Sequence, residues 1–328
     1  MKELSLKYKL TTMLLILTIF TGYGVCKINS LQAANEDKIS MDFIMAAGDY
    51  NLSKIIDGRG DIEMTQETTL LDGNESKHKR QEFRMNVSFI GSNMEKMRID
   101  SLNIMETDSK EKLVKHFFNE QTVINYTVNR KVASIESIEE TVIKWSPTPM
   151  RWICPLQYGV SIDGKSFRNA LNDLKNRGAS YELKKAPSED FVLLEGIRTD
   201  EIGNIGKVVY QMDITKNFFI NKSEGSLRMK GQDKWIPVKS VEIVPVLTNV
   251  GWLPQEVTFT LNSYEGINGE VVLRLTMREK TIYKNFKFNL GLQEADLKIN
   301  LPKGTFVVDQ IAGIQYFVGA DGVDDKGE

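Results

Sequence analysis

The sequence contains few of the residues on which most catalytic and metal sites depend. Its 328 residues include only two cysteines, Cys26 and Cys154, and two histidines, His78 and His116. Neither histidine has another histidine or a cysteine at the spacing of a zinc site, so no zinc site is expected. A Gly-x-Ser-x-Gly motif, a P-loop and a dinucleotide-binding fingerprint are also missing. These absences predict a protein that is not an enzyme and that has no metal or cofactor.

The chain also lacks a strong excess of charge and a long apolar segment. Its formal net charge is −2, with 26% charged and 41% hydrophobic residues. A weakly acidic protein is a poor candidate for non-specific nucleic-acid binding, and we expect no nucleic-acid partner. The longest apolar run, Leu10 to Phe20, is shorter than the ~20 residues that span a membrane. We therefore expect a mature chain that is peripheral to the membrane and has no spanning helix.

The N-terminus has the features of a secretory signal peptide. A positive segment, an apolar run and small residues follow one another, namely Lys2, Lys7 and Lys9, then Leu10 to Phe20, then Ala33 and Ala34. Cleavage after one of these alanines would leave a mature chain that begins near residue 35. We therefore expect residues 1–34 to be a signal peptide and the protein to be secreted across the inner membrane into the periplasm or cell envelope.

Two alternatives for this segment stay open. One is an uncleaved membrane anchor. The other is lipidation of Cys26, although Val25 stands where a bacterial lipobox has a small residue. Cleavage after Ala33 or Ala34 would leave Cys154 as a lone cysteine, which excludes an intramolecular disulfide.

Apolar and polar residues alternate along most of the remaining chain. Clear examples are Val257 to Leu261 and Val271 to Met277, in which every second side chain is apolar. A period of two predicts antiparallel strands with one dry face and one wet face. Helical periodicity is clear in two segments, one within Glu36 to Ile56 and one within Ser166 to Gly178. The sequence therefore predicts a mainly β (α+β) fold with one large antiparallel sheet and two helices.

The last part of the chain continues this alternation. "ADLKINLPKGTFVVDQIAGIQYFVG", from Ala295 to Gly319, predicts a strand over Leu297 to Leu301, a Pro-Lys-Gly turn, and a second strand that ends at Asp309. These strands are expected to complete the sheet. Residues 320–328 are acidic and rich in glycine, which predicts a flexible tail. Residues 35–319 then form a single domain.

Three segments near the C-terminus carry a resemblance to a known family. They are "GWLPQEVTFTLNS", "GEVVLRLTMREKTIYKNFKFN" and "LKINLPKGTFVVDQIAGIQY". Together with the order of elements from about Ile39 to Val318, they resemble the LolA/LolB-like lipoprotein carriers and the related outer-membrane lipoprotein-sorting proteins. The resemblance implies a strongly curved, unclosed sheet (a half-barrel) with the N-terminal helix and the mid-chain helix on its concave side. It also implies that the cargo is a lipid or lipoprotein acyl chain.

A cavity between the sheet and the two helices is the candidate ligand site. An apolar wall would accept an acyl chain at ~0.8 kcal/mol per buried methylene. Because the register of each strand decides which face a residue occupies, the wall positions are hypotheses. They are Phe43, Val87, Phe89, Val257, Phe259, Leu261, Leu273 and Leu275. The alternative is that these residues only pack on one another and fill the core.

The proline-rich middle of the chain, "WSPTPMRWICPLQYG", is the candidate lid or contact loop. Its prolines exclude a central strand, and Trp145 and Trp152 give it an aromatic character. These side chains either cover the core or contact other envelope proteins. The sequence thus predicts an exported carrier of a hydrophobic, acyl-chain-bearing ligand. An interaction module of the same fold without a ligand cavity is the alternative.

Overall fold

The chain consists of two compact units, Met1–Ile44 and Met45–Glu328. The computed structural model describes residues 39–72, 75–91, 96–105, 108–119, 122–137, 167–267, 270–319 and 324–325. Helix α2 (Met41–Ser53) begins in the first unit and ends in the second. The second unit holds the sheet and all other described elements.

One sheet forms the framework of the second unit. Its strand order is β16-β15-β14-β6-β5-β4-β3-β2-β1-β13-β12-β11-β10-β9-β8-β7. The strands of its first half are β1 (Asp57–Asp72), β2 (Glu75–Ile90), β3 (Lys96–Met105), β4 (Asp108–Phe118), β5 (Thr122–Thr127) and β6 (Val132–Ser137). The strands that follow the mid-chain helix are β7 (Ser180–Lys185), β8 (Phe191–Thr199), β9 (Ile205–Asp213), β10 (Phe219–Arg228), β11 (Ile236–Thr248), β12 (Gly251–Ile267) and β13 (Glu270–Phe288).

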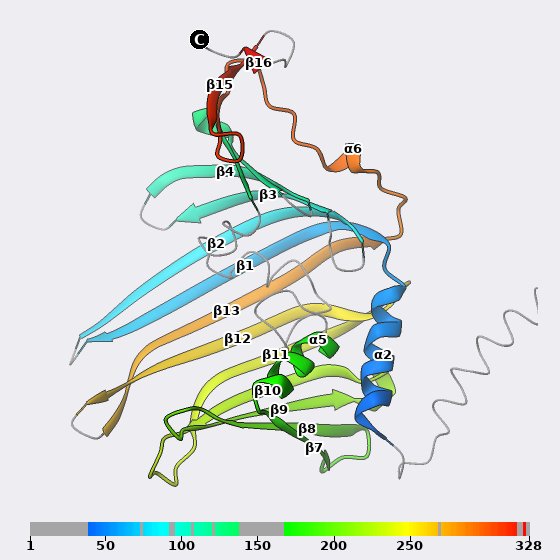
Figure 1. The fold of residues 1–328 in the computed structure, drawn as a ribbon, viewed down its shortest axis with the longest axis vertical. Coiled ribbons are helices and arrows are strands. Elements are labelled where there is room, and N and C mark those ends of the chain that lie inside the picture. The colour runs from blue at the N-terminus through cyan, green and yellow to red at the C-terminus, as the bar shows by residue number, and fades with distance from the viewer. Residues whose placement is uncertain are drawn as a thin grey trace, which may run out of the picture. The chain divides into compact units, whose positions relative to one another are not determined.

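The sheet is curved and unclosed, as the sequence predicted. Its end strands, β7 and β16, do not pair with each other, and Figure 1 shows the long central strands bending as one layer. The two predicted helices are also present, as α2 and as α5 (Phe167–Asn176). The remaining described helices are single turns: η2 (Val128–Arg130), η3 (Ile214–Lys216) and α6 (Glu294–Leu297).

One face of the sheet is apolar, and strand alternation creates it. The buried cluster on this face, here called the apolar face, draws most of its members from β1 to β5 and from β11 to β13. It comprises Ile55, Ile62, Met64, Met85, Val87, Phe89, Met97, Ile99, Phe118, Val123, Val241, Ile243, Val250, Leu253, Val257, Phe259, Tyr283 and Phe288. Full burial of an aliphatic or aromatic side chain contributes about 1.5–3 kcal/mol. The cluster therefore stabilises the sheet, and it fixes the register of the strands that contribute to it.

The opposite face, here called the polar face, carries cross-strand ion pairs. Lys284 Nζ lies 2.7 Å from Glu63 Oε2, and Arg274 Nε lies 2.7 Å from Glu265 Oε2. Exposed pairs of this kind contribute only about 0–1 kcal/mol each. They keep the face charged and soluble, in contrast to the face behind it.

The segment before the last hairpin differs from the prediction. Residues Leu297 to Leu301, predicted as a strand, form the end of α6 and an extended connection. The cause is a capping box, because the side chain of Gln293 accepts a hydrogen bond from the N–H of Asp296, and Asp296 Oδ2 accepts one from the N–H of Gln293 at 2.8 Å. These bonds start a helical turn where the apolar alternation alone suggested a strand.

The alternation in this segment has another origin. Leu297 is fully buried, and Ile299 and Leu301 pack against a second cluster that contains Tyr126 and Val307. Asn125 pairs with His116, and His116 pairs with Ile99 of the apolar face. Tyr126 is the next residue along the strand, so its side chain lies on the opposite, polar face. Every second residue therefore contacts the polar face of the sheet instead of pairing as a strand within it.

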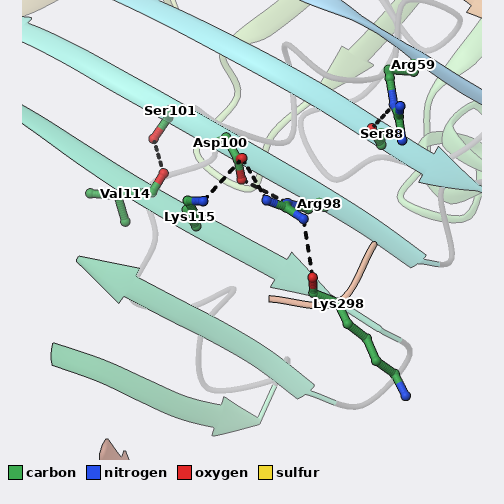
Figure 2. Close-up of polar contacts among 8 residues, drawn as sticks. All are labelled: Arg59, Ser88, Arg98, Asp100, Ser101, Val114, Lys115 and Lys298. Atoms are coloured by element: carbon green, nitrogen blue, oxygen red, sulfur yellow. Dashed lines mark hydrogen bonds and ion pairs between the residues drawn. The ribbon is translucent and has the colours of Figure 1, made fainter. Parts of the chain in front are cut away.

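Arg98 joins this connection to the polar face. Its guanidinium donates two hydrogen bonds to the Asp100 carboxylate, from Nε at 3.0 Å and from Nη2 at 2.9 Å. The third nitrogen, Nη1, donates to the Lys298 carbonyl oxygen at 3.3 Å. Lys115 Nζ lies 3.9 Å from the same Asp100 carboxylate. Figure 2 shows these contacts and the nearby hydrogen bond from Arg59 to Ser88. The C-terminal segment is thus held on the polar face by both charge and packing.

The last strands complete the sheet at its far edge. Strand β14 (Phe306–Asp309) pairs in parallel with β6, and β15 (Ile314–Val318) pairs antiparallel with β14. Strand β16 (Asp324–Asp325), which falls in the predicted tail, pairs with β15. The sheet is antiparallel throughout except for the β6–β14 pair.

Candidate ligand-binding face

The strand register brings most of the candidate wall residues to one face. On β12 and β13, Val257 pairs with Thr281, Phe259 with Glu279 and Leu261 with Met277. On β1 and β2, Val87 pairs with Gly60 and Phe89 with Gly58. Val87, Phe89, Val257 and Phe259 belong to the buried cluster, and Leu261 packs against it. The seven wall residues of the strands therefore share the apolar face, because Leu273 and Leu275 lie in phase with Met277 on β13.

Aromatic rings close one end of this face over the glycines of β1. The rings of Phe89 and Phe288 have centroids 6.4 Å apart, and those of Phe286 and Phe288 are 5.9 Å apart. A Cβ atom on Gly60 would lie 2.3 Å from Cδ2 of Phe286, and one on Gly58 would lie 2.7 Å from Cζ of Phe89. The absence of side chains at these two positions is therefore what lets the rings lie flat on the strand.

The side chains at the other end of the apolar face are more exposed to solvent. Leu261, Leu273, Leu275 and Met277 are half-buried, and Leu70, which pairs with Leu275, is 45% exposed. These five residues, here called the half-buried end, extend the apolar face along the long strands β1, β12 and β13 beyond the buried cluster. Apolar side chains thus continue along these strands beyond the buried cluster that stabilises the sheet.

Several polar side chains lie within the apolar face, and the sequence analysis did not single them out. Glu279 and Thr281 are fully buried, and Ser223 is 1% exposed. The hydroxyl groups of Thr281 and Ser223 have no hydrogen-bond partner within the described residues. Glu279 and Thr281 continue the alternation of Leu275 and Met277, so their phase is the only sequence signal that marks them. Polar groups in such a position can bind the polar atoms of an amphipathic ligand.

Two tyrosines lie further along the same face. Tyr210 pairs with Ser223 and is buried, and its burial raises the pKa of the phenol above its usual value. Burial likewise raises the pKa of Tyr181 to about 12. Both phenols therefore stay protonated at physiological pH, and they are hydrogen-bond donors and not charged groups.

The helices account for the remaining candidate positions only in part. Phe43 is half-buried and lies in the first unit, so it stays a prediction as a wall residue. Tyr50 of the same helix is 49% exposed, and Ile44 is buried. Further along α2, Asp49 Oδ2 accepts a hydrogen bond from Arg168 Nε of α5 at 2.7 Å. The lid or contact residues Trp145 and Trp152 lie outside the described residues.

Each of the two histidines lies within hydrogen-bond distance of a side chain on a neighbouring strand. His116 Nδ1 lies 2.8 Å from Asn125 Oδ1 on the neighbouring strand, and its ring stacks on Phe118 with centroids 6.1 Å apart. His78 Nδ1 lies 2.9 Å from Thr69 Oγ1.

Across the described part of the chain, no group of three or more histidine, cysteine, aspartate or glutamate residues is placed to hold a metal ion. Among the described helices, none is both long enough and apolar enough to cross a membrane.

Comparisons with known proteins give similarities of fold. No family model and no curated protein matches the chain. Among solved structures, a LolA superfamily protein from Nitrosomonas europaea is similar with a TM-score of 0.42 and 10% identity, over 80% of this chain and 99% of that one. A DUF1329 family protein from Desulfovibrio piger follows with a TM-score of 0.36 and 12% identity, over 78% of this chain and 97% of that one.

A third similar structure is an outer membrane lipoprotein-sorting protein domain from Vibrio parahaemolyticus. Its TM-score is 0.33 and its identity 12%, over 77% of this chain and 95% of that one. The structures found include a LolA superfamily protein and an outer membrane lipoprotein-sorting domain.

Proposed function

We propose that this chain is an exported cell-envelope protein that binds and carries a hydrophobic ligand with an acyl chain, such as a lipid or a lipoprotein. The observation that supports the proposal is the half-buried end of the apolar face. There, five apolar side chains extend beyond the buried cluster along an unclosed sheet. Such a surface is costly in water and favours an apolar guest.

The mechanism is burial and release, without bond chemistry. Each methylene of an acyl chain that leaves water contributes ~0.8 kcal/mol, so about ten buried methylenes supply roughly 8 kcal/mol, from which the cost of association is subtracted. The polar residues at Glu279 and Thr281 lie in the same face, next to the apolar positions Phe259 and Val257 of β12. An amphipathic ligand would place its polar group near them and its chain along Leu275 and Leu273.

Binding of a fluorescent fatty acid to delipidated protein tests the proposal. We expect saturable binding by the unaltered chain. The double variant Leu273→Gln/Leu275→Gln should bind at least about tenfold more weakly, because two half-buried apolar contacts are replaced by polar groups.

The control changes the same strand on its other face. Val272 and Ile282 are also half-buried, but they lie on the polar face, since each is one residue out of phase with the apolar positions. Val272→Gln/Ile282→Gln should therefore leave fatty-acid binding unchanged. Absence of saturable binding by the unaltered protein, or equal loss in both double variants, would contradict the proposal.

Export is tested separately. The proposed cleavage after Ala33 or Ala34 predicts a mature N-terminus at residue 34 or 35, which N-terminal sequencing of protein from the periplasmic fraction can determine. A chain that retains residue 1 and stays with the membrane would support the anchor instead. A lipid-modified N-terminus at Cys26 would support lipidation.

An interaction module is the second candidate, and one observation favours it. The C-terminal hairpin exposes apolar side chains at one edge of the sheet: Phe317 is 58% exposed, Ile311 53% and Ile314 40%. Exposed apolar side chains gathered on one hairpin suit a protein partner. If this function holds, Phe317→Ser should abolish capture of an envelope partner without altering fatty-acid binding.

A further inference from the structure

Two turns at one end of strands β8 to β11 form a single continuous surface. The side-chain oxygen Oδ1 of Asn204, which follows the β8–β9 turn, accepts a hydrogen bond at 3.0 Å from the N–H of Lys230 in the β10–β11 turn. The stem of Lys230 lies on Gly203, where a Cβ atom would be 3.2 Å from Lys230 Cδ. Asp200 fixes the first turn by accepting hydrogen bonds from the N–H groups of Ile202 at 3.1 Å and Asn204 at 2.8 Å. The two turns are therefore held side by side.

Trp235 organises the cations of this surface. Its ring lies 4.5 Å from Lys207 Nζ and 5.1 Å from the Arg228 guanidinium carbon, measured from the ring centroid. Lys230 and Lys234 are exposed beside it in the same turn region. Cations over an indole keep their charge available while their stems stay ordered.

These four cations have no carboxylate within ion-pair distance among the described residues. The contrast with the polar face of the sheet is clear, because there Lys280 and Lys284 lie 2.8 and 2.7 Å from glutamate oxygens. Two exposed acidic residues, Glu201 and Asp233, are nearby in sequence, while Asp200 is engaged in its own turn. The surface therefore carries four cations against these three carboxylates, although the whole chain has a net charge of −2.

An exposed aliphatic residue completes the surface. Ile202 is 69% exposed at the tip of the β8–β9 turn, the highest exposure among the large hydrophobic side chains of the described residues. Its position there has no role in the core. Together with a tryptophan and unpaired cations, an exposed isoleucine is the combination found where proteins rest on a lipid–water interface.

We propose that this surface, formed by Ile202, Lys207, Arg228, Lys230, Lys234 and Trp235, docks on an anionic lipid surface. The cations would lie among the negatively charged headgroups, the indole would lie at the interface, and Ile202 would insert among the first acyl carbons. A lipid surface fits better than a nucleic acid, because an exposed isoleucine at the tip of a turn can enter the apolar layer of a membrane and has no such medium along a phosphate backbone. The docking is independent of ligand binding, since none of these residues belongs to the apolar face.

Sedimentation of the full chain with lipid vesicles tests the proposal. We expect binding to phosphatidylcholine vesicles that contain phosphatidylglycerol, weaker binding to pure phosphatidylcholine vesicles, and loss of binding as salt rises. Lys230→Glu/Lys234→Glu should weaken binding to the anionic vesicles roughly tenfold or more, because each basic residue near such a surface contributes strongly. Ile202→Ser should weaken binding without changing its dependence on salt.

The control variant is Lys287→Glu/Lys303→Glu, which changes the net charge equally at two exposed lysines elsewhere. It should bind the anionic vesicles much better than Lys230→Glu/Lys234→Glu. Brominated lipid should also quench the fluorescence of the unaltered protein more strongly than that of Trp235→Phe. No binding to anionic vesicles, equal loss in the two lysine variants, or equal quenching with and without Trp235 would each overturn the proposal. Fatty-acid binding measured on the same lysine variants should be unchanged, which separates this docking from the proposed carrier function.

Discussion

Asp57 and Asn289 join the start of β1 to the end of β13. The N–H of Asn289 donates to the Asp57 carbonyl oxygen at 2.9 Å. The Asn289 side chain accepts from the N–H of Ile56 and donates to the Lys54 carbonyl oxygen, both at 2.9 Å. These bonds connect residues more than two hundred positions apart, and they fix the junction between helix α2 and the centre of the sheet.

The first prediction concerns the carboxylate of Asp57, which is buried at this junction. Its two oxygens accept hydrogen bonds from the N–H groups of Leu290, Gly291 and Leu292, at 2.6, 2.9 and 3.1 Å. Asp57→Ala removes the buried acceptor of all three donors and should lower the free energy of unfolding by about 2–4 kcal/mol. Urea denaturation measures the change. Asp233→Ala, at an exposed position, should shift the free energy by less than about 0.5 kcal/mol, and equal shifts in both variants would contradict the role of the junction.

The second prediction concerns pH and Asp213, which is buried in the β9–β10 connection. Burial tends to raise the pKa of its carboxyl, but hydrogen bonds from Lys216 and Thr215, the charge of Lys216 and a hydrogen bond from Asn221 together lower that pKa. A lowered pKa in the folded chain gives stability that is present above the unfolded value of about 3.9. That stability is lost as the pH falls through the folded value.

Asp213→Asn removes this charge and should lower the free energy of unfolding at neutral pH by about 1–3 kcal/mol. The difference between the variant and the unaltered protein should begin to shrink as the pH falls below about 4, where the carboxyl of the unfolded chain becomes protonated. It should be smallest below the lowered folded value, where the native carboxyl is protonated as well. Chemical denaturation at several pH values checks both points. A difference that stays constant down to the lowest pH would contradict the proposed role of the charge.

The sequence allowed the apolar face to be predicted because the alternation is unusually regular. Every second residue from Val257 to Leu261 and from Leu273 to Met277 is apolar, and burial of one face fixes which register the strands adopt. The same pattern did not predict that Glu279 is buried in this face, because a polar residue at a position where an apolar one is expected usually marks the end of a strand. Its place between Phe259 and Gln66 depends on pairing between β12, β13 and β1, which a single sequence does not contain.

The C-terminal segment shows a second limit. The alternation of Leu297, Ile299 and Leu301 has the same period whether a segment pairs within a sheet or lies across its face. The capping box of Gln293 and Asp296 is a short-range signal that separates the two cases. The parallel pairing of β14 with β6 has no such local signal, because it joins segments that are far apart in the chain.

The third prediction tests why the face needs glycine at position 60. An added methyl group would lie 2.3 Å from the Phe286 ring, so Gly60→Ala should lower the free energy of unfolding by about 1–3 kcal/mol. Gly206→Ala is the control in another strand, since its Cβ would meet nothing closer than 3.8 Å. It should shift the free energy much less.

A double variant links the effect at position 60 to the ring. Phe286→Leu removes the edge of the aromatic group, so Gly60→Ala should cost less in the Phe286→Leu background than in the unaltered chain. The difference between the two costs is the coupling energy of a double-mutant cycle, for which contacting residues typically show about 0.5–3 kcal/mol. Additive effects would mean that the close approach of Phe286 is not the reason for the glycine.

The last prediction concerns the connection that crosses the polar face. Leu297 is fully buried there, whereas Leu290, seven residues earlier, is 46% exposed. Leu297→Ala removes buried methyl groups and should lower the free energy of unfolding by about 2–5 kcal/mol, while Leu290→Ala should change it by less than about 1 kcal/mol. Since this connection leads directly into β14 and β15, amide exchange in Leu297→Ala should rise first in these strands and in β6. Faster exchange spread evenly over the central strands β1, β12 and β13 would show instead that the connection does not anchor this edge of the sheet.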